Sequence, residues 1–135
     1  MSVINWTPAI SVGISSIDDQ HKKLFDHINN FYNNLSKNIG KENLTALLQA
    51  LTSYTVYHFS AEEKLMQQYA FPGLTEHKTE HEKFIKTIAS YNERLNAGKL
   101  IVSIEITNYL KDWIIEHISV SDKNYSSFLI SKGVH

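Results

Sequence analysis

Five histidines and two carboxylates recur along the chain at spacings suited to binding metal ions. His77 and His81 lie four residues apart, and the same spacing separates His58 from Glu62. Residues four apart project from the same face of a helix, so two such side chains can bind one ion. Either pair alone is a weak signal, but their repetition favours a shared site. The candidate ligands are His21, His58, Glu62, His77, His81, His117 and Asp122.

The chemical types of these ligands indicate which metals they suit. Imidazole nitrogen and carboxylate oxygen together bind iron, zinc, manganese or copper, and the chain has no cysteine to supply a softer thiolate. If both carboxylates and one solvent-derived oxygen bridge two six-coordinate ions, a single coordination position stays open. Such a site predicts binding of one small ligand, and dioxygen is the leading candidate.

His117 and Asp122 are less regularly spaced, because they are five residues apart. On a regular α-helix this spacing turns the two side chains about 140° apart. We therefore expect either a local π-helical widening, which is common at functional sites, or an approach of Asp122 to the metal from a different direction than His117.

Other polar residues near these positions are expected outside the ligand set. His21 has no ligand-type residue four positions on, and it is included only because the first helix would otherwise contribute nothing. His27 lies about 120° around the helix from His21 and is expected to be exposed. His135 is terminal and unrelated to the site. Because adjacent helical positions point about 100° apart, Glu63 and Glu80 are expected at the surface or in outer contact with a ligand.

Apolar residues repeat at steps of three and four, which predicts four helices at about 15–40, 41–69, 75–98 and 103–130. Ser15 and Asp18 have the spacing of a capping box, and Thr75 and Ser103 are the expected N-caps of the last two helices. The expected helix stops are Gly40, the turn at 71–73, and Gly98. Apolar side chains near the ligands are expected to pack in the core and keep water from the site: Phe59, Phe84, Leu110, Trp113 and Ile114.

Short connections between the helices favour antiparallel neighbours. We therefore expect an all-α fold, an up-down-up-down antiparallel four-helix bundle at 15–131. An N-terminal arm at 1–14 should pack on this body through Trp6 and Ile10. Residues 1–135 have the length of one domain, and a bundle that buries its own core is expected to be a monomer.

The composition restricts the classes of partner. A net charge of -1 and the absence of basic runs argue against nucleic acid and anionic membranes as partners. The N-terminus lacks a basic region followed by an apolar stretch, and no apolar run approaches membrane-spanning length. The expected location is the cytoplasm. Without cysteine, disulfides and thiol chemistry are excluded.

In combination, the motifs at 17–25, 58–63, 77–84 and 113–122 closely resemble those of the hemerythrin family. Trp6 and the segment 12–14 are similar to the arm of its bacterial single-domain members. The resemblance covers nearly the whole chain. It implies a single hemerythrin-like domain that holds two non-haem irons with an oxo or hydroxo bridge and binds dioxygen reversibly for storage, transport or sensing.

The resemblance also implies a role for each ligand. One iron would be held by His77, His81 and His117. The other would be held by His21 and His58, and Glu62 and Asp122 would bridge the two irons. Dioxygen would bind at the iron with two histidines. Ile114 falls where the family places an aliphatic residue against dioxygen, while Phe59, Phe84 and Trp113 match pocket positions. Tyr125 matches a position in outer contact with the ligands.

Three alternatives use the same residues. A di-iron oxidase, peroxidase or nitric oxide scavenger would need high iron oxidation states, which anionic ligands stabilise better than five neutral imidazoles. We therefore expect a carrier and not an enzyme. Zinc proteolysis is suggested by the H-x-x-E-H pattern at 77–81 with Glu80 as base, but it leaves the other ligands unexplained. The third alternative is a signalling module, in which the presence or absence of bound oxygen would control a protein partner. That partner would be a separate chain.

Overall fold

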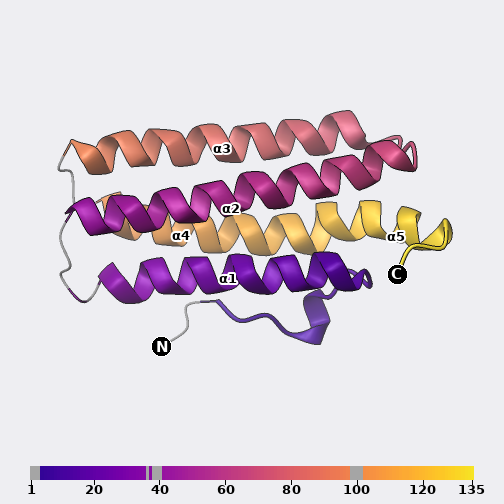
Figure 1. The fold of residues 1–135 in the computed structure, drawn as a ribbon, viewed down its shortest axis with the longest axis horizontal. Coiled ribbons are helices and arrows are strands. Elements are labelled where there is room, and N and C mark those ends of the chain that lie inside the picture. Colours follow the sequence, from indigo (N-terminus) through magenta and orange to yellow (C-terminus); the bar gives the residue numbers. More distant parts are fainter. Residues whose placement is uncertain (1–3, 36, 38–40, 98–101) are drawn as a thin grey trace.

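The computed structural model describes residues 4–35, 37, 41–97 and 102–135. Helices α1 (Ser15–Leu35), α2 (Lys41–Gln68), α3 (Leu74–Asn96) and α4 (Val102–Glu116) run along one common direction. Helix α4 continues through the π-helical segment η2 (His117–Asp122) into α5 (Lys123–Ser131). Helix α1 contacts α2 and α4, and α3 contacts the same two helices. The described residues contain no strand, and the chain forms the expected up-down-up-down bundle (Figure 1).

This topology decides where the polar residues meet. In an up-down-up-down bundle, the starts of α1 and α3 lie at the same end as the finishes of α2 and α4 (Figure 1). The candidate ligands occupy these four places, so the fold brings them to one end of the bundle. The apolar core fills the rest of the interior with fully buried side chains that include Phe31, Leu48, Leu51, Ile88 and Leu110.

The helix ends differ from the expected ones in three places. Thr75 lies inside the first turn of α3, whose N-cap is Gly73, and Ser103 lies inside α4. Asp18 does not close a capping box on Ser15. Its carboxylate instead accepts hydrogen bonds from Ser11 Oγ, at 2.5 Å, and from the backbone N–H of Val12, at 2.9 Å. The proposed stops Gly40 and Gly98 lie outside the described residues.

Helix α2 ends one turn before Pro72. Its end is formed by Ala70, a residue type that does not usually indicate a helix end. The Phe71 N–H donates to the carbonyl of Met66, as in a Schellman motif, and Ala70 between them has a φ of 55°. This left-handed conformation is usual for glycine and costs an alanine about 1–2 kcal/mol. Phe71, directly after Ala70, packs its ring against Tyr125 and Phe128.

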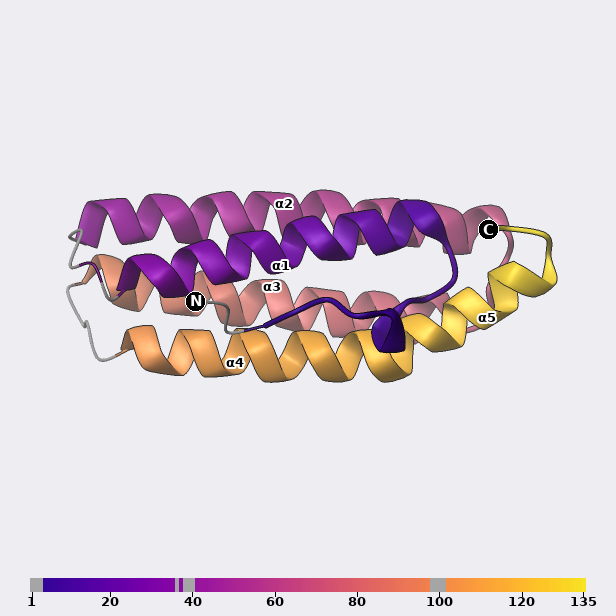
Figure 2. The ribbon, with the colours of Figure 1, turned by 90° about the horizontal axis from the view of Figure 1, so that it is seen from below.

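The N-terminal arm crosses the face of the bundle formed by α1 and α4 (Figure 2). Trp6 and Ile10 are half-buried against the core, as expected, while Ile4 and Val12 are buried more deeply. Asn29 on α1 exchanges two hydrogen bonds with the backbone of Ile4, at 2.8 and 3.1 Å. None of the helices in the described part of the chain is long and apolar enough to cross a membrane.

Candidate metal centre

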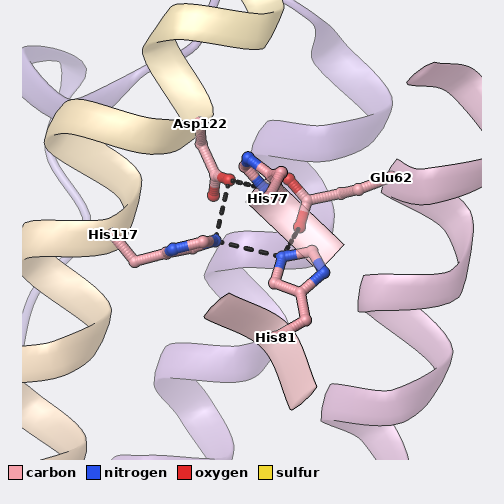
Figure 3. A group of neighbouring side chains, drawn as sticks. All are labelled: Glu62, His77, His81, His117 and Asp122. Atoms are coloured by element: carbon pink, nitrogen blue, oxygen red, sulfur yellow. Dashed lines mark hydrogen bonds and ion pairs between the residues drawn. The ribbon is translucent and has the colours of Figure 1, made fainter. Parts of the chain in front are cut away.

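The seven candidate ligands converge at one end of the bundle interior, and none has more than 5% of its surface exposed. Their ligand atoms form two groups that share the same two carboxylates. The three-histidine group contains His77, His81 and His117 with Glu62 and Asp122, and is drawn in Figure 3. The two-histidine group contains His21 and His58 with Glu62 and Asp122.

In the three-histidine group, the imidazoles point their Nε2 atoms toward one another and toward the carboxylates (Figure 3). Asp122 Oδ1 lies 3.0 Å from His77 Nε2 and 3.1 Å from His117 Nε2. His81 Nε2 lies 3.0 Å from His117 Nε2 and 3.6 Å from Glu62 Oε1. Three nitrogens and two oxygens from α2, α3 and η2 therefore face a common point.

In the two-histidine group, the same carboxylates face two further imidazoles. Asp122 Oδ2 lies 3.1 Å from His21 Nε2, and Glu62 Oε1 lies 3.0 Å from His58 Nε2. The ring centroids of His21 and His58 are 4.7 Å apart. Since the two oxygens of Asp122 face different groups, this carboxylate is placed to bridge two ions.

The π-helical segment η2 runs from His117 to Asp122, the stretch where the sequence predicts a widened helix. The wider turn brings side chains five residues apart onto the same side, which a regular α-helix cannot do. Both residues are buried and lie 3.1 Å apart at their ligand atoms. The irregular spacing is thus explained by a π-helix.

The donor set fits metal ions better than it fits a hydrogen-bonded core. Several of its buried polar atoms lie close to another ligand atom but form no hydrogen bond of proper geometry among the described residues: His21 Nε2, His77 Nε2, Glu62 Oε1 and both carboxylate oxygens of Asp122. A buried polar group without a partner costs about 1–3 kcal/mol, and more if it is charged. Cations between these atoms would satisfy all of them, and imidazole with carboxylate is a donor set that suits iron.

The outer nitrogens of three imidazoles are held by other side chains, which turns each Nε2 toward the centre. The Nδ1 of His81 donates to Glu63 Oε2 at 2.8 Å, and that of His58 donates to Gln20 Oε1 at 2.7 Å. Glu80 Oε2 lies 3.3 Å from His117 Nδ1. Such outer partners fix the tautomer and orientation of a ligand. Glu63 and Glu80 are therefore in outer contact with ligands.

Protonation states differ among the histidines. Burial, together with the positive charges of His117 and His77, lowers the pKa of His81 to about 2, so its imidazole is neutral and able to bind a cation. Burial also lowers the pKa of His58, but the carboxylate of Glu62 outweighs this and the net shift is upward. The pKa of His117 is raised in the same way by Asp122. Because a proton and a metal ion compete for the same imidazole nitrogen, metal binding by His58 and His117 is expected to weaken as the pH falls.

Gln20 is the outer partner that sequence reasoning missed, and it allows a test. Replacing Gln20 with alanine is expected to lower iron affinity by about 10–100-fold, because His58 loses the acceptor that orients it. Competition with a chelator of known affinity measures the change. The matched control is Gln67→Ala, an exposed glutamine on α2, which should bind iron like the unmodified chain. Equal affinity in both variants would show that Gln20 does not orient His58.

Aromatic rings cover the three-histidine group. Phe59 stacks on His81 with centroids 3.7 Å apart and planes within 2°, and Trp113 stacks on His117 at 4.3 Å. Phe59 also lies 6.0 Å from His58. Two further residues expected near the site are buried: Ile114, at 1% exposure, and Tyr125, whose hydroxyl donates to Glu62 Oε2.

The two histidines expected outside the site lie away from it. His27 is half-buried and not exposed as expected, because its ring packs against Tyr54 with centroids 5.2 Å apart. His135 is exposed at the end of the chain, and its Nδ1 lies 3.2 Å from the carbonyl of Gly133. Neither belongs to a group of potential ligands among the described residues.

Comparisons with known proteins agree with this arrangement. A family model described as the hemerythrin HHE cation binding domain matches residues 12–129. A bacteriohemerythrin of Methylococcus capsulatus is 33% identical over 134 residues, which is 96% of this chain and 98% of that protein. A hemerythrin-like protein of Naegleria gruberi is 33% identical, with 95% of each chain covered. A solved structure of wild-type hemerythrin matches with a TM-score of 0.86 and 31% identity, covering 93% of this chain and 97% of that one. The chain therefore belongs to the hemerythrin family.

Proposed function

We propose that this chain binds dioxygen reversibly at two non-haem irons, for oxygen storage, transport or sensing. The observation that carries the proposal is the pair of buried groups with three and two histidines that share Glu62 and Asp122. Ferrous irons held there would supply the electrons for dioxygen binding, and the two-histidine group, which offers one imidazole fewer, would leave room for the oxygen. We also propose that residues 1–135 form one hemerythrin-like domain that acts as a monomer, because its helices bury their own core.

In this proposal each part of the site has a separate task. The three-histidine group would hold one iron, the two-histidine group would hold the other, and Glu62 and Asp122 would bridge them. Tyr125 positions Glu62 through its hydrogen bond to Oε2. Apolar walls keep water and protons from the centre, and we assign this task to Ile114, Phe59, Phe84 and Trp113.

The ligand types favour a carrier over an enzyme. Di-iron enzymes of the ferritin-like class use mainly carboxylates with Glu-x-x-His pairs, whereas this centre has five imidazoles. Neutral ligands stabilise high iron oxidation states less than anionic ones do. Glu80, the base that zinc proteolysis would need, lies beside the outer Nδ1 of His117 and not beside the inner Nε2.

The proposal is tested by reducing the iron-loaded protein without oxygen, and then admitting and removing oxygen while the visible spectrum is recorded. The expected result is two irons per chain and a charge-transfer band that appears with oxygen and disappears under vacuum. Immediate irreversible oxidation, or steady turnover of peroxide or nitric oxide in place of reversible oxygen binding, would instead indicate a di-iron oxidase, peroxidase or scavenger.

Replacing Ile114 with alanine is expected to shorten the lifetime of the oxygenated spectrum. Ile114 is buried three residues before His117, so its loss opens the apolar wall to water. The free energy of unfolding should also fall by about 2–5 kcal/mol. Spectral decay in air and chemical denaturation measure the two effects. The control is Ile106→Ala, which removes an equally buried isoleucine of α4 farther from the ligands and should destabilise without shortening the lifetime. Equal lifetimes would contradict the role of Ile114.

A further inference from the structure

Four aromatic side chains form a line of ring contacts that leads from His117 toward the opposite end of the bundle. Trp113 stacks on His117 with planes 14° apart and centroids 4.3 Å apart. Phe84 lies 4.2 Å from Trp113 and 5.8 Å from Tyr109. Tyr109 in turn lies 5.7 Å from Tyr91 on α3. An unbroken series of rings thus connects a candidate iron ligand to a half-buried tyrosine.

The chemical types in this line are not those that core packing alone requires. Trp113, Tyr109 and Tyr91 are half-buried, whereas Phe84 between them is fully buried. Tyr109 and Trp113 are four residues apart on α4, as are Trp113 and His117, so they form one stripe along the helix. Tryptophan and tyrosine are the aromatic side chains that most readily give up an electron. Phenylalanine and leucine lack that property.

Other rings near the centre do not form a separate line of oxidisable side chains. Phe59 stacks on His81 and lies 5.9 Å from Trp113, but phenylalanine is not readily oxidised. Tyr125 lies 5.1 Å from His77, and its next ring contact is Phe71 at 6.4 Å. Among the described residues, the Trp113 line is therefore the route by which oxidisable rings lead away from the centre.

We propose that Trp113, Tyr109 and Tyr91, with Phe84 packed between them, form a relay that carries oxidising equivalents from the metal centre to the protein surface. The inference rests on the proposed di-iron site. The oxidant is a peroxide, which takes up two electrons and two protons at the centre and is reduced to two molecules of water. Each electron leaves Trp113 and is replaced from Tyr109 and then from Tyr91.

Tyr91 is suited to be the exit. A tyrosine hydroxyl is protonated at neutral pH and loses its proton when the ring loses an electron, and half-buried Tyr91 can release that proton to water. Burial and the nearby charge of Glu105 raise its pKa further. The guanidinium of Arg94 lies 5.8 Å from its ring centroid and pairs with Glu105 at 3.4 Å. A small one-electron donor in solution, such as a phenol or an enediol, then returns one electron and one proton to Tyr91. For each peroxide reduced, two donor molecules are oxidised by one electron each.

The test treats iron-loaded and metal-free protein with a small excess of hydrogen peroxide and without a donor. Freeze-quench EPR records the aromatic radical, and peptide mapping by mass spectrometry locates oxidised residues and dityrosine. We expect a radical and oxidation at Tyr91 only in the iron-loaded protein. Trp113→Phe should reduce oxidation of Tyr91 to the level of the metal-free protein. Tyr91→Phe should shift oxidation inward to Tyr109 and Trp113.

Tyr57→Phe is the matched control, because it removes an exposed tyrosine of α2 outside the relay and should leave the oxidation of Tyr91 unchanged. Unchanged oxidation of Tyr91 in the Trp113→Phe variant, or equal oxidation in metal-free protein, would overturn the relay. The visible spectrum of the same samples under oxygen and vacuum reports reversible binding separately. If the protein retains iron but does not bind oxygen reversibly, the proposed function fails and the map of oxidised residues still tests the relay. If the chain binds no iron, both the proposed function and the relay are refuted.

Discussion

Replacing Asp122 with asparagine is expected to abolish stable binding of both irons. Its carboxylate lies where the two groups meet, with Oδ2 3.1 Å from His21 Nε2 and Oδ1 3.0 Å from His77 Nε2. Asparagine keeps the size of the side chain but removes its charge and replaces one acceptor oxygen with an NH₂ donor. Because loss of an outer partner alone weakens a metal site about 10–100-fold, loss of a shared ligand should weaken it by more than about 100-fold. Elemental analysis after desalting measures iron per chain.

The control for this variant is Asp112→Asn, which makes the same chemical change at an exposed position of α4. It should retain both irons. Circular dichroism of the Asp122→Asn variant distinguishes a lost site from a lost fold. If this variant is folded and still holds two irons, Asp122 does not bridge them.

The pairing of ligands could be predicted from the sequence because it depends on local helix geometry. A spacing of four puts His77 and His81 on the same face in any α-helix, and the structure places their ring centroids 4.5 Å apart. The five-residue spacing before Asp122 predicts a departure from α-helix, because no regular helix would bring both side chains to one side. The four-helix bundle followed from the same periodicity together with short connections.

Contacts between helices could not be predicted in the same way, because they depend on how neighbouring helices are rotated against each other. Gln20 precedes a ligand of α1, yet it orients His58 on α2. Glu63 and Glu80 were expected either at the surface or in outer contact with ligands, and only the packing of α3 against its neighbours decides between these positions. A sequence shows which face a residue occupies but not what lies opposite it.

The predicted helix ends were wrong where tertiary contacts outweigh the local preference of a residue for a capping position. Asp18 has the spacing to cap α1, but its carboxylate accepts hydrogen bonds from the arm at Ser11 and Val12 instead. Ala70 adopts the left-handed conformation that glycine would be expected to supply. Because a cap contributes only about 1 kcal/mol, the burial of neighbouring apolar residues can override it.

Replacing His21 with alanine is expected to remove one iron and retain the other. His21 belongs to the two-histidine group alone, so the three-histidine group keeps all its ligand atoms. The iron content should fall from two per chain to one, and the band that depends on oxygen should disappear, because the open position is assigned to the iron that is lost. Elemental analysis and spectra recorded with and without oxygen measure both effects.

His27→Ala is the matched control for the His21 variant, because it removes a second histidine of α1 that packs on Tyr54 and not on the ligands. It should retain two irons and the oxygen spectrum. Loss of both irons in the His21→Ala variant would show that the two groups cannot be filled separately. Retention of the oxygen band with one iron would place oxygen binding at the three-histidine group. Asp122 contacts both groups, whereas His21 belongs to only one. If Asp122 is a shared ligand, the Asp122→Asn variant must therefore lose two irons and the His21→Ala variant only one.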